Sequence, residues 1–210
     1  KHFDFEPGSH TIDVQYTVTN LAAEAAQLTP FVQLKRDSSP APVASDAGMG
    51  MQPFLGSALT QPDQRFTKFD FEDMAEDPFR ADLTGGWIAM LQHYFVSAWV
   101  PDPDNTYRFR TRQTRSGDNI IGYTGPAMVI TSGETTTISN RLYVGPKNQS
   151  VLADLAKHLD LVVDYGWLWW IAQPLFWLLT MIQSVVINWG VAIIFLTLLV
   201  KLAFFQLSAV

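Results

Sequence analysis

The chain contains 210 residues and no cysteine, and its 14 Lys and Arg against 20 Asp and Glu give a net charge of −6. The absence of cysteine excludes disulfide scaffolds, zinc sites built on thiolates and thiol nucleophiles. The acidic balance argues against nucleic-acid binding, which usually requires a basic surface. Because the chain opens on Lys1 without a signal-peptide pattern, we expect it to be a fragment of a longer protein.

Charge is distributed so unevenly that the sequence predicts two different environments. Up to Asp164 the chain holds 13 Lys and Arg and all 20 acidic residues, whereas Tyr165–Val200 holds none and Lys201 is the only charge thereafter. Five of the seven tryptophans fall in this last stretch: Trp167, Trp169, Trp170, Trp177 and Trp189. An apolar stretch without charge belongs in or on a lipid bilayer.

The polar part shows the alternation of β-strands with one buried face. In Thr11–Thr19 and again in Tyr107–Gln113, apolar and polar side chains alternate along the chain. Further short strands are expected at Ile120–Tyr123, Ala127–Ile130 and Thr135–Val144, separated by glycine and proline. Short strands with turn residues between them predict an antiparallel sandwich over residues 1–149.

Three other segments of the polar part have distinct patterns. Gly85–Val100 is strongly apolar but shorter than a membrane-spanning helix, so we expect one or two deeply buried strands. Arg36–Gln64 is rich in proline and glycine and predicts a long irregular excursion. Ser150–Val162 predicts a helix with Ser150 as its N-cap, within a connecting segment over residues 150–164.

The segment Tyr165–Ser184 is long enough to span a bilayer but has features of a helix lying in its interface. Pro174 falls in the middle, where it removes a backbone hydrogen bond and predicts a kink. Trp and Tyr prefer the headgroup region, where each ring can be half hydrated. The sequence therefore predicts an interfacial amphipathic helix over residues 165–187, bent near Pro174, with a turn around Ile187–Trp189.

The last segment, Trp189–Val210, predicts a transmembrane helix within residues 188–210, with Trp189 as an interfacial anchor. Lys201 lies near its centre, where a lysine costs about 2.5–3.5 kcal/mol to insert. Such residues usually face a bundle interior or an aqueous cavity. The alternative is that the span is shorter than Trp189–Val210 and that the long side chain of Lys201 reaches the interface.

Two runs in the C-terminal part of the chain resemble a known family. The runs HLDLVVDYGWLWWIAQPLFWLL at His158–Leu179 and NWGVAIIFLTLLVKLAFF at Asn188–Phe205 are similar to the YidC membrane protein insertases of Gram-negative bacteria. Gly85–Pro101 resembles the end of the large periplasmic domain of that family. The resemblance implies a mainly β fold: an antiparallel β-supersandwich in the periplasm, followed by the interfacial helix and the first core transmembrane α-helix.

The resemblance also implies a function and partners. In that family a cation on the first core helix lies in a hydrophilic groove that receives nascent membrane proteins, and the matching position here is Lys201. Gln206 stands where family members usually have proline. The family implies the Sec translocon, the ribosome and membrane lipids as partners, and the bacterial inner membrane as location. It implies no enzymatic reaction, no cofactor and no metal.

Other functions remain open from the residues alone. The rival function is a membrane-anchored, carbohydrate-binding or carbohydrate-processing β-sandwich, which a cleft with two carboxylates lined by tryptophan would favour. The acidic run Asp70–Asp77 could hold calcium or supply such carboxylates, but acidic surface loops are common. His93 is expected to be a hydrogen-bonded core residue. The arginines of Tyr107–Gln113 are expected on a solvated strand face. The alternative is that they bind an anionic lipid or a sugar phosphate.

Overall fold

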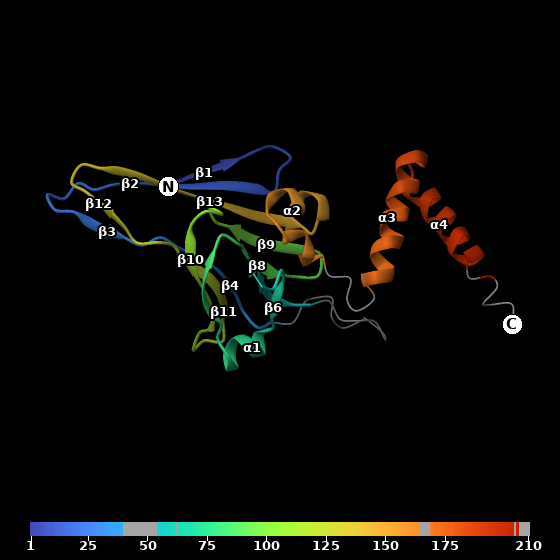
Figure 1. The fold of residues 1–210 in the computed structure, drawn as a ribbon, viewed down its shortest axis with the longest axis horizontal. Coiled ribbons are helices and arrows are strands. Elements are labelled where there is room, and N and C mark those ends of the chain that lie inside the picture. The colour runs from blue at the N-terminus through green and yellow to red at the C-terminus, as the bar shows by residue number, and fades with distance from the viewer. Residues whose placement is uncertain (40–53, 62, 164–168, 204, 206–210) are drawn as a thin grey trace. The chain divides into compact units, whose positions relative to one another are not determined.

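The computed structural model describes residues 1–39, 54–61, 63–163, 169–203 and 205, and only the backbone of Trp169. The chain divides into two compact units, Lys1–Val163 and Asp164–Val210. The first unit is built from β-strands with short helices, and the second from two helices (Figure 1).

The first unit contains thirteen strands among its described residues: β1 (His2–Phe5), β2 (Thr11–Thr19), β3 (Ala26–Leu28), β4 (Phe31–Arg36), β5 (Gly56–Leu59), β6 (Thr67–Phe69), β7 (Arg80–Thr84), β8 (Ile88–Leu91), β9 (Phe95–Val100), β10 (Thr106–Gln113), β11 (Asn119–Thr124), β12 (Met128–Ile130) and β13 (Thr135–Pro146). Its helices are α1 (Phe71–Glu76), α2 (Gln149–Leu155) and the 3₁₀ helix η1 (Leu159–Val162). The second unit contains α3 (Trp169–Val186) and α4 (Trp189–Ala203).

The strands form an antiparallel sandwich, as the sequence predicts. A seven-stranded sheet has the order β1-β2-β13-β9-β8-β5-β6, and a four-stranded sheet has the order β4-β11-β10-β7. Strands β3 and β12 form a separate two-stranded sheet (Figure 1). All described pairings are antiparallel.

The two clearest sequence patterns form strands at the expected places. Strand β2 covers Thr11–Thr19, and Val14 on its apolar face is fully buried. In β10, Tyr107 and Phe109 are buried while the arginines between them are exposed. Period-two alternation identifies these strands because successive side chains point to opposite faces of a sheet.

The first core lies between the two large sheets. Leu59, Ile88 and Met90 of the seven-stranded sheet pack here with side chains from the four-stranded sheet: Val32, Tyr107, Phe109, Ile121 and Tyr123. The Tyr123 hydroxyl donates a 2.8 Å hydrogen bond to Asn140 Oδ1 on β13, which joins the two sheets. Burial, and secondarily the nearby Tyr107, raise the pKa of Tyr123 above its usual range, so the hydroxyl stays protonated as a donor.

The second core lies on the opposite face of the seven-stranded sheet. Ala89 and Leu91 of β8 belong to this core, together with Leu152, Leu159 and Val162 of the helices. Strand β8 is therefore buried on both faces, which explains why Gly85–Val100 lacks alternation. The prediction of buried strands in this run is confirmed, with a turn between β8 and β9.

The helix predicted over Ser150–Val162 is interrupted. Helix α2 ends at Leu155, His158 adopts the left-handed conformation with φ of 68°, and η1 begins at Leu159. The N-cap position is Asn148 rather than Ser150. Leu152 before the break and Leu159 and Val162 after it belong to the same core.

Two further sequence expectations were wrong. Within Arg36–Gln64, residues 40–53 and 62 lie outside the described residues, but Gly56–Leu59 forms the fully buried strand β5 rather than an irregular segment. Its short GSAL sequence carries little strand signal, so its place between β8 and β6 determines its conformation. His93 is half-buried in the β8–β9 turn and stacks on Tyr94, with ring centroids 3.9 Å apart, instead of lying in the core.

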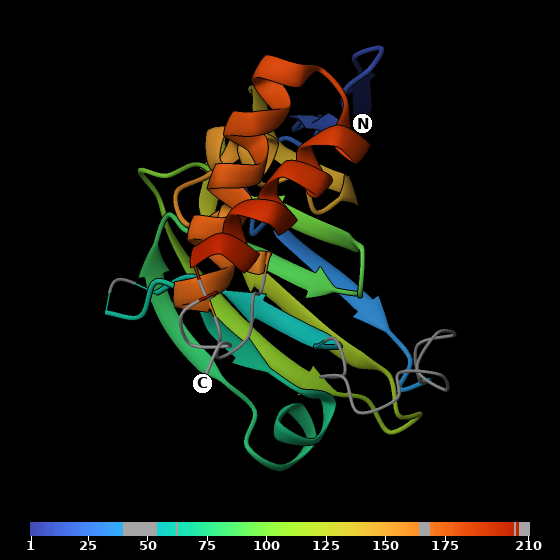
Figure 2. The ribbon, with the colours of Figure 1, turned by 90° about the vertical axis from the view of Figure 1, so that its right-hand side faces the viewer.

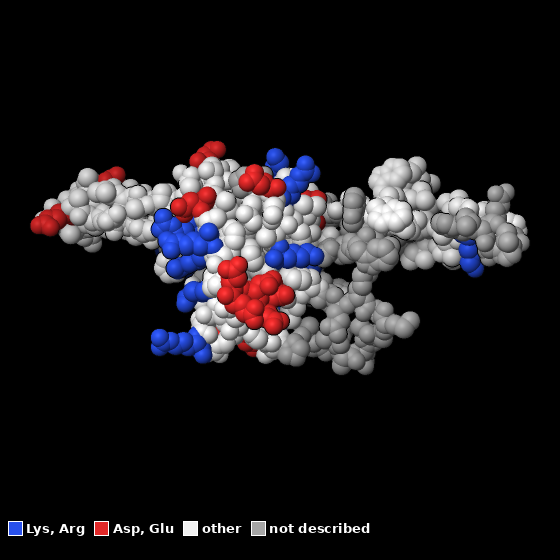
Figure 3. Space-filling view, turned by 60° about the horizontal axis from the view of Figure 1, so that its bottom comes forward, with Lys and Arg blue, Asp and Glu red and all other residues white. Residues whose placement is uncertain are grey.

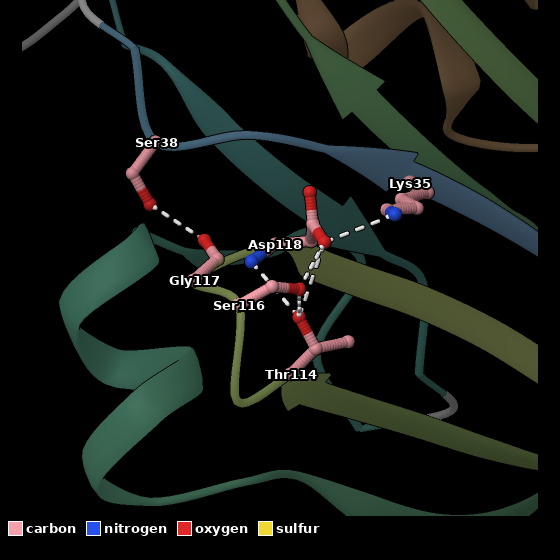
Figure 4. Close-up of polar contacts among 6 residues, drawn as sticks. All are labelled: Lys35, Ser38, Thr114, Ser116, Gly117 and Asp118. Carbon is pink, nitrogen blue, oxygen red and sulfur yellow. Dashed lines mark hydrogen bonds and ion pairs between the residues drawn. The ribbon is translucent and has the colours of Figure 1, made fainter.

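A polar network holds the turn between β10 and β11 against β4 (Figure 4). The Asp118 carboxylate accepts hydrogen bonds from Ser116 Oγ at 2.6 Å and Thr114 Oγ1 at 3.3 Å, and pairs with Lys35 Nζ at 2.9 Å. Ser38 Oγ donates to the Gly117 carbonyl at 3.1 Å. The hydrogen bond from Ser116, followed by that from Lys35, holds the pKa of Asp118 below its ordinary value.

We expect Leu152→Ala to lower the free energy of unfolding of the β unit by about 2–5 kcal/mol, because it opens a cavity under α2. Leu152 is fully buried, whereas the neighbouring Val151 is 40% exposed. Val151→Ala is therefore the matched control and should change stability by less than about 0.5 kcal/mol. Urea denaturation of the chain in mild detergent measures both, and equal losses would contradict the described helix layer.

The Asp118 network predicts a pH-dependent stability. Because the pKa of Asp118 is lower in the folded than in the unfolded chain, its stabilisation is present above the unfolded pKa of about 3.9 and is lost as pH falls through the folded pKa. Asp118→Asn should thus destabilise the chain at pH 7, and the difference from the parent should shrink below about pH 4. Denaturation at several pH values tests this, with Asp104→Asn as the exposed control. A pH-independent difference would contradict the carboxylate's role.

Candidate functional site: the apolar helix pair

The second unit is a pair of contacting helices in which the chain reverses direction (Figures 1 and 2). Between α3 and α4, Ile187 has a φ of 56°, and Asn188 Oδ1 accepts a 3.2 Å hydrogen bond from the Val191 amide. Asn188 thereby caps the first turn of α4. The turn predicted around Ile187–Trp189 is confirmed.

The surface of this helix pair is strongly apolar. Among the described residues of α4, only Ala192 is buried. The large exposed apolar side chains of both helices include Ile171, Phe176, Met181, Val185, Ile193, Ile194, Phe195, Leu198, Leu199 and Leu202. A continuous apolar surface of this kind indicates contact with a membrane or with another protein.

The hydroxyl groups of the pair bond within their own helices. Thr180 Oγ1 donates to the Trp177 carbonyl at 2.8 Å, and Ser184 Oγ donates to the Met181 carbonyl at 2.7 Å. In α4, Thr197 Oγ1 donates to the Ile193 carbonyl at 2.7 Å. Since these donors are already bonded, the hydroxyls are compatible with surroundings that offer no water.

The structure describes the side chains of three of the five tryptophans predicted as interface anchors. Trp170, Trp177 and Trp189 expose 58%, 65% and 51% of their surface. Trp170 and Trp177 are seven residues apart, so they share one face of α3. Trp167 lies outside the described residues, and for Trp169 only the helical backbone is described.

Pro174 lies inside α3, with helix on both sides. Because proline has no amide hydrogen, the Trp170 carbonyl loses its usual partner four residues later. This position is where the sequence predicts a bend, and the bend remains a prediction.

Lys201 lies in the last turn of α4 and is exposed. Residues 165–210 contain no Asp or Glu, so no carboxylate of this segment can neutralise it. Thr197 precedes it by one turn on the same side of the helix. The arrangement presents one cation on an otherwise apolar surface.

The described helices fall short of a full membrane span. Helix α4 has 15 residues, which rise about 22 Å, whereas the hydrocarbon core of a bilayer is about 30 Å thick. Among the described residues, no helix combines the length and hydropathy needed to cross. The span predicted over residues 188–210 includes 204 and 206–210, which are outside the described residues.

Comparison with known proteins decides the family. The model of the YidC periplasmic domain matches residues 1–178, which include the whole β unit and the first part of α3. The chain belongs to the YidC family.

Relatives in this family match across both units. The membrane protein insertase YidC of Marinomonas sp. (strain MWYL1) is 48% identical over 209 residues, covering 100% of this chain and 38% of that protein. The insertase of Azotobacter vinelandii (strain DJ / ATCC BAA-1303) is 44% identical and covers 100% of this chain and 37% of its own length. The chain thus spans little more than a third of these relatives.

The β unit offers no arrangement typical of a carbohydrate enzyme or a metal site in its described part. A cleft of about 860 Å³ is lined by Trp87 and by a single carboxylate, that of Asp154. Trp87 is fully buried and therefore cannot stack on a sugar. The described residues contain no group of three or more His, Asp or Glu placed to hold a metal ion.

The acidic run belongs to α1 and its ends. Asp70 is the N-cap and accepts a 2.8 Å hydrogen bond from the Asp73 amide, so its side chain has a structural role. The exposed arginines of β10 lie on the solvated face of the four-stranded sheet, where Arg108 pairs with Asp82 at 3.0 Å. Figure 3 shows acidic side chains gathered in a patch with basic side chains beside it.

The exposed tryptophans of α3 predict a shallow position in a bilayer. Because the chain has no cysteine, a spin label attached through Trp177→Cys reports one site. In vesicles, we expect this label to lie within about 5–10 Å of the boundary between headgroups and acyl chains. A label at Leu198→Cys in α4 is the control and should lie deeper. Equal or greater depth at position 177 would contradict an interfacial α3.

Proposed function

We propose that this chain is the part of a bacterial membrane protein insertase that joins the periplasmic β-domain to the first core membrane helix. The observation that supports this function is the junction itself: a β-sandwich of the YidC family is followed by an apolar helix pair whose single charged residue is Lys201. The names of the relatives support the same activity.

In this proposal the two helices have different positions in the membrane. Residues 165–187 lie along the periplasmic surface, anchored by Trp167, Trp169, Trp170 and Trp177 and bent at Pro174. Residues 188–210 cross the inner membrane, with Trp189 at the periplasmic boundary. The exposed Trp170 and Trp177 on one face of α3, and the reversal of the chain before Trp189, support this division.

Lys201 supplies the positive charge of a hydrophilic groove. A nascent membrane segment enters the groove, so that its polar flank avoids the bare hydrocarbon, which polar groups enter only at high cost. The ammonium group attracts acidic residues of that flank, and water in the groove lowers the cost of placing the cation there. The process makes and breaks no covalent bond and needs no cofactor.

The partners follow from this activity. Nascent membrane proteins are the substrates, and the Sec translocon and the ribosome deliver them. Membrane lipids surround the helices. The exposed apolar side chains of α3 and α4 support a lipid or protein environment for the pair.

Substitutions at Lys201 in the full-length insertase test the proposal. Lys201→Arg should keep insertion because the charge is retained, while Lys201→Ala should impair it and Lys201→Glu should impair it more. The measurement is growth of an insertase-depleted strain that expresses each variant at matched level. Full rescue by Lys201→Glu would contradict the electrostatic role and favour a lysine that merely reaches the interface.

Moving the charge provides the matched control. Thr197 lies one turn before Lys201 on the same face of α4, whereas Leu199 lies on the opposite face. In a Lys201→Ala background, Thr197→Lys should restore part of the activity and Leu199→Lys should not. Equal rescue by both would show that the position of the charge is irrelevant.

A further inference from the structure

The cleft of about 860 Å³ in the β unit, called here the α2 cleft, lies between α2 with its following turn and the seven-stranded sheet. Its walls include Trp87 before β8, Val100 at the end of β9, and Leu155 and Ala156 at the end of α2. Its volume is in the range of sites that hold small organic ligands. The activity proposed above uses no part of it.

Basic side chains dominate the charged lining of the α2 cleft. Arg65 comes from the β5–β6 connection, Arg141 from β13, and Lys157 and His158 from the turn after α2. The one acidic residue in the lining is Asp154. This excess is opposite to the acidic balance of the first 164 residues, so the cleft is a local basic site on an acidic domain.

Within the described part of the chain, Arg65, Arg141 and Lys157 form no ion pair with a carboxylate. The ion pairs of Lys35 with Asp118 and of Arg108 with Asp82 lie outside the cleft. Arg65, Arg141 and Lys157 are all exposed to solvent. Unpaired cations from three separate segments around one cleft favour an anion with several oxygens, since guanidinium groups bind phosphate with paired hydrogen bonds.

The turn that carries Lys157 and His158 is fixed by contacts with the core of the β unit. Trp87 is fully buried, and its Nε1 donates a 3.1 Å hydrogen bond to the Lys157 carbonyl. Leu152 before the turn and Leu159 after it are both anchored in the core. The backbone at Lys157 and His158 is therefore positioned without a ligand, which lowers the entropic cost of binding one.

We propose that the α2 cleft binds the phosphodiester headgroup of an anionic phospholipid. Apolar residues Pro101, Pro103 and Leu155 line it beside the cations, which suits the glycerol and first methylenes of a lipid. This assignment depends on the proposed function, in which the Trp-bearing α3 lies at the headgroups.

Lipid binding by the whole 210-residue chain in detergent micelles tests the site. Native mass spectrometry counts bound phosphatidylglycerol, with phosphatidylcholine as the uncharged comparison. Neutralising the cleft with Arg65→Gln, Arg141→Gln and Lys157→Gln together should lower the apparent affinity for phosphatidylglycerol about tenfold or more and leave phosphatidylcholine unchanged. The single variant Lys157→Gln, at an exposed position, should show a smaller loss in the same direction if the triple variant folds poorly.

The matched control removes the same charge from another surface. Arg108→Gln, Arg110→Gln and Arg112→Gln on the exposed face of β10 should change phosphatidylglycerol binding less than about twofold. Equal losses in both triple variants would show a general charge effect and overturn the proposal, as would parental binding by the cleft variant. Displacement of the lipid by an equal concentration of inorganic phosphate would assign the cleft to the free anion instead.

The experiments distinguish a failure of the lipid-site proposal from a failure of the proposed insertase function. Lys201→Glu should leave phosphatidylglycerol binding at the cleft unchanged, because Lys201 does not line it. Loss of selective lipid binding only in the cleft variant supports the site even if the complementation test fails. If the cleft variant binds lipid as the parent does, while the Lys201 variants behave as expected in the complementation test, the lipid site is overturned and the insertase function is supported.

Discussion

The structure of the β unit depends on the burial of strand β8 on both faces. Ile88 and Met90 pack against the four-stranded sheet, and Ala89 and Leu91 pack under the helices. A sheet with two apolar faces needs a cover on each, because exposed apolar area is unfavourable in water. The second cover is the α2–η1 layer, which ends the described part of the β unit. The last segment of the β unit is thus itself part of a hydrophobic core.

The same layer shapes the α2 cleft. Leu152 and Leu159, on either side of the break at His158, belong to one core, and Trp87 Nε1 donates a hydrogen bond to the Lys157 carbonyl between them. In a continuous helix that carbonyl would instead accept a hydrogen bond from the backbone amide four residues later. The left-handed residue is thus tied both to the packing of the core and to the arrangement of basic side chains beside it.

The two units are adapted to different solvents. In the β unit, polar groups pair with one another at the surface, as in the network around Asp118. In the helix pair, the hydroxyls of Thr180, Ser184 and Thr197 bond to helix carbonyls, while apolar side chains face outward. Such surfaces are stable only where the surroundings are also apolar, which agrees with a family of membrane proteins. A lone cation in that setting is costly, so Lys201 is the natural centre of the proposed function.

The sequence by itself determined the elements whose pattern is strong and local. Strands β2 and β10 follow from alternation, and the apolar helix pair with its single charge follows from composition, because periodicity and hydropathy can be read from neighbouring residues. The family resemblance likewise rested on contiguous motifs. Only the tertiary structure decided the strand role of Gly56–Leu59, the break at His158 and the meeting of Arg65 with Arg141 in one cleft. These features depend on contacts between residues far apart in the chain, and no local propensity specifies such contacts.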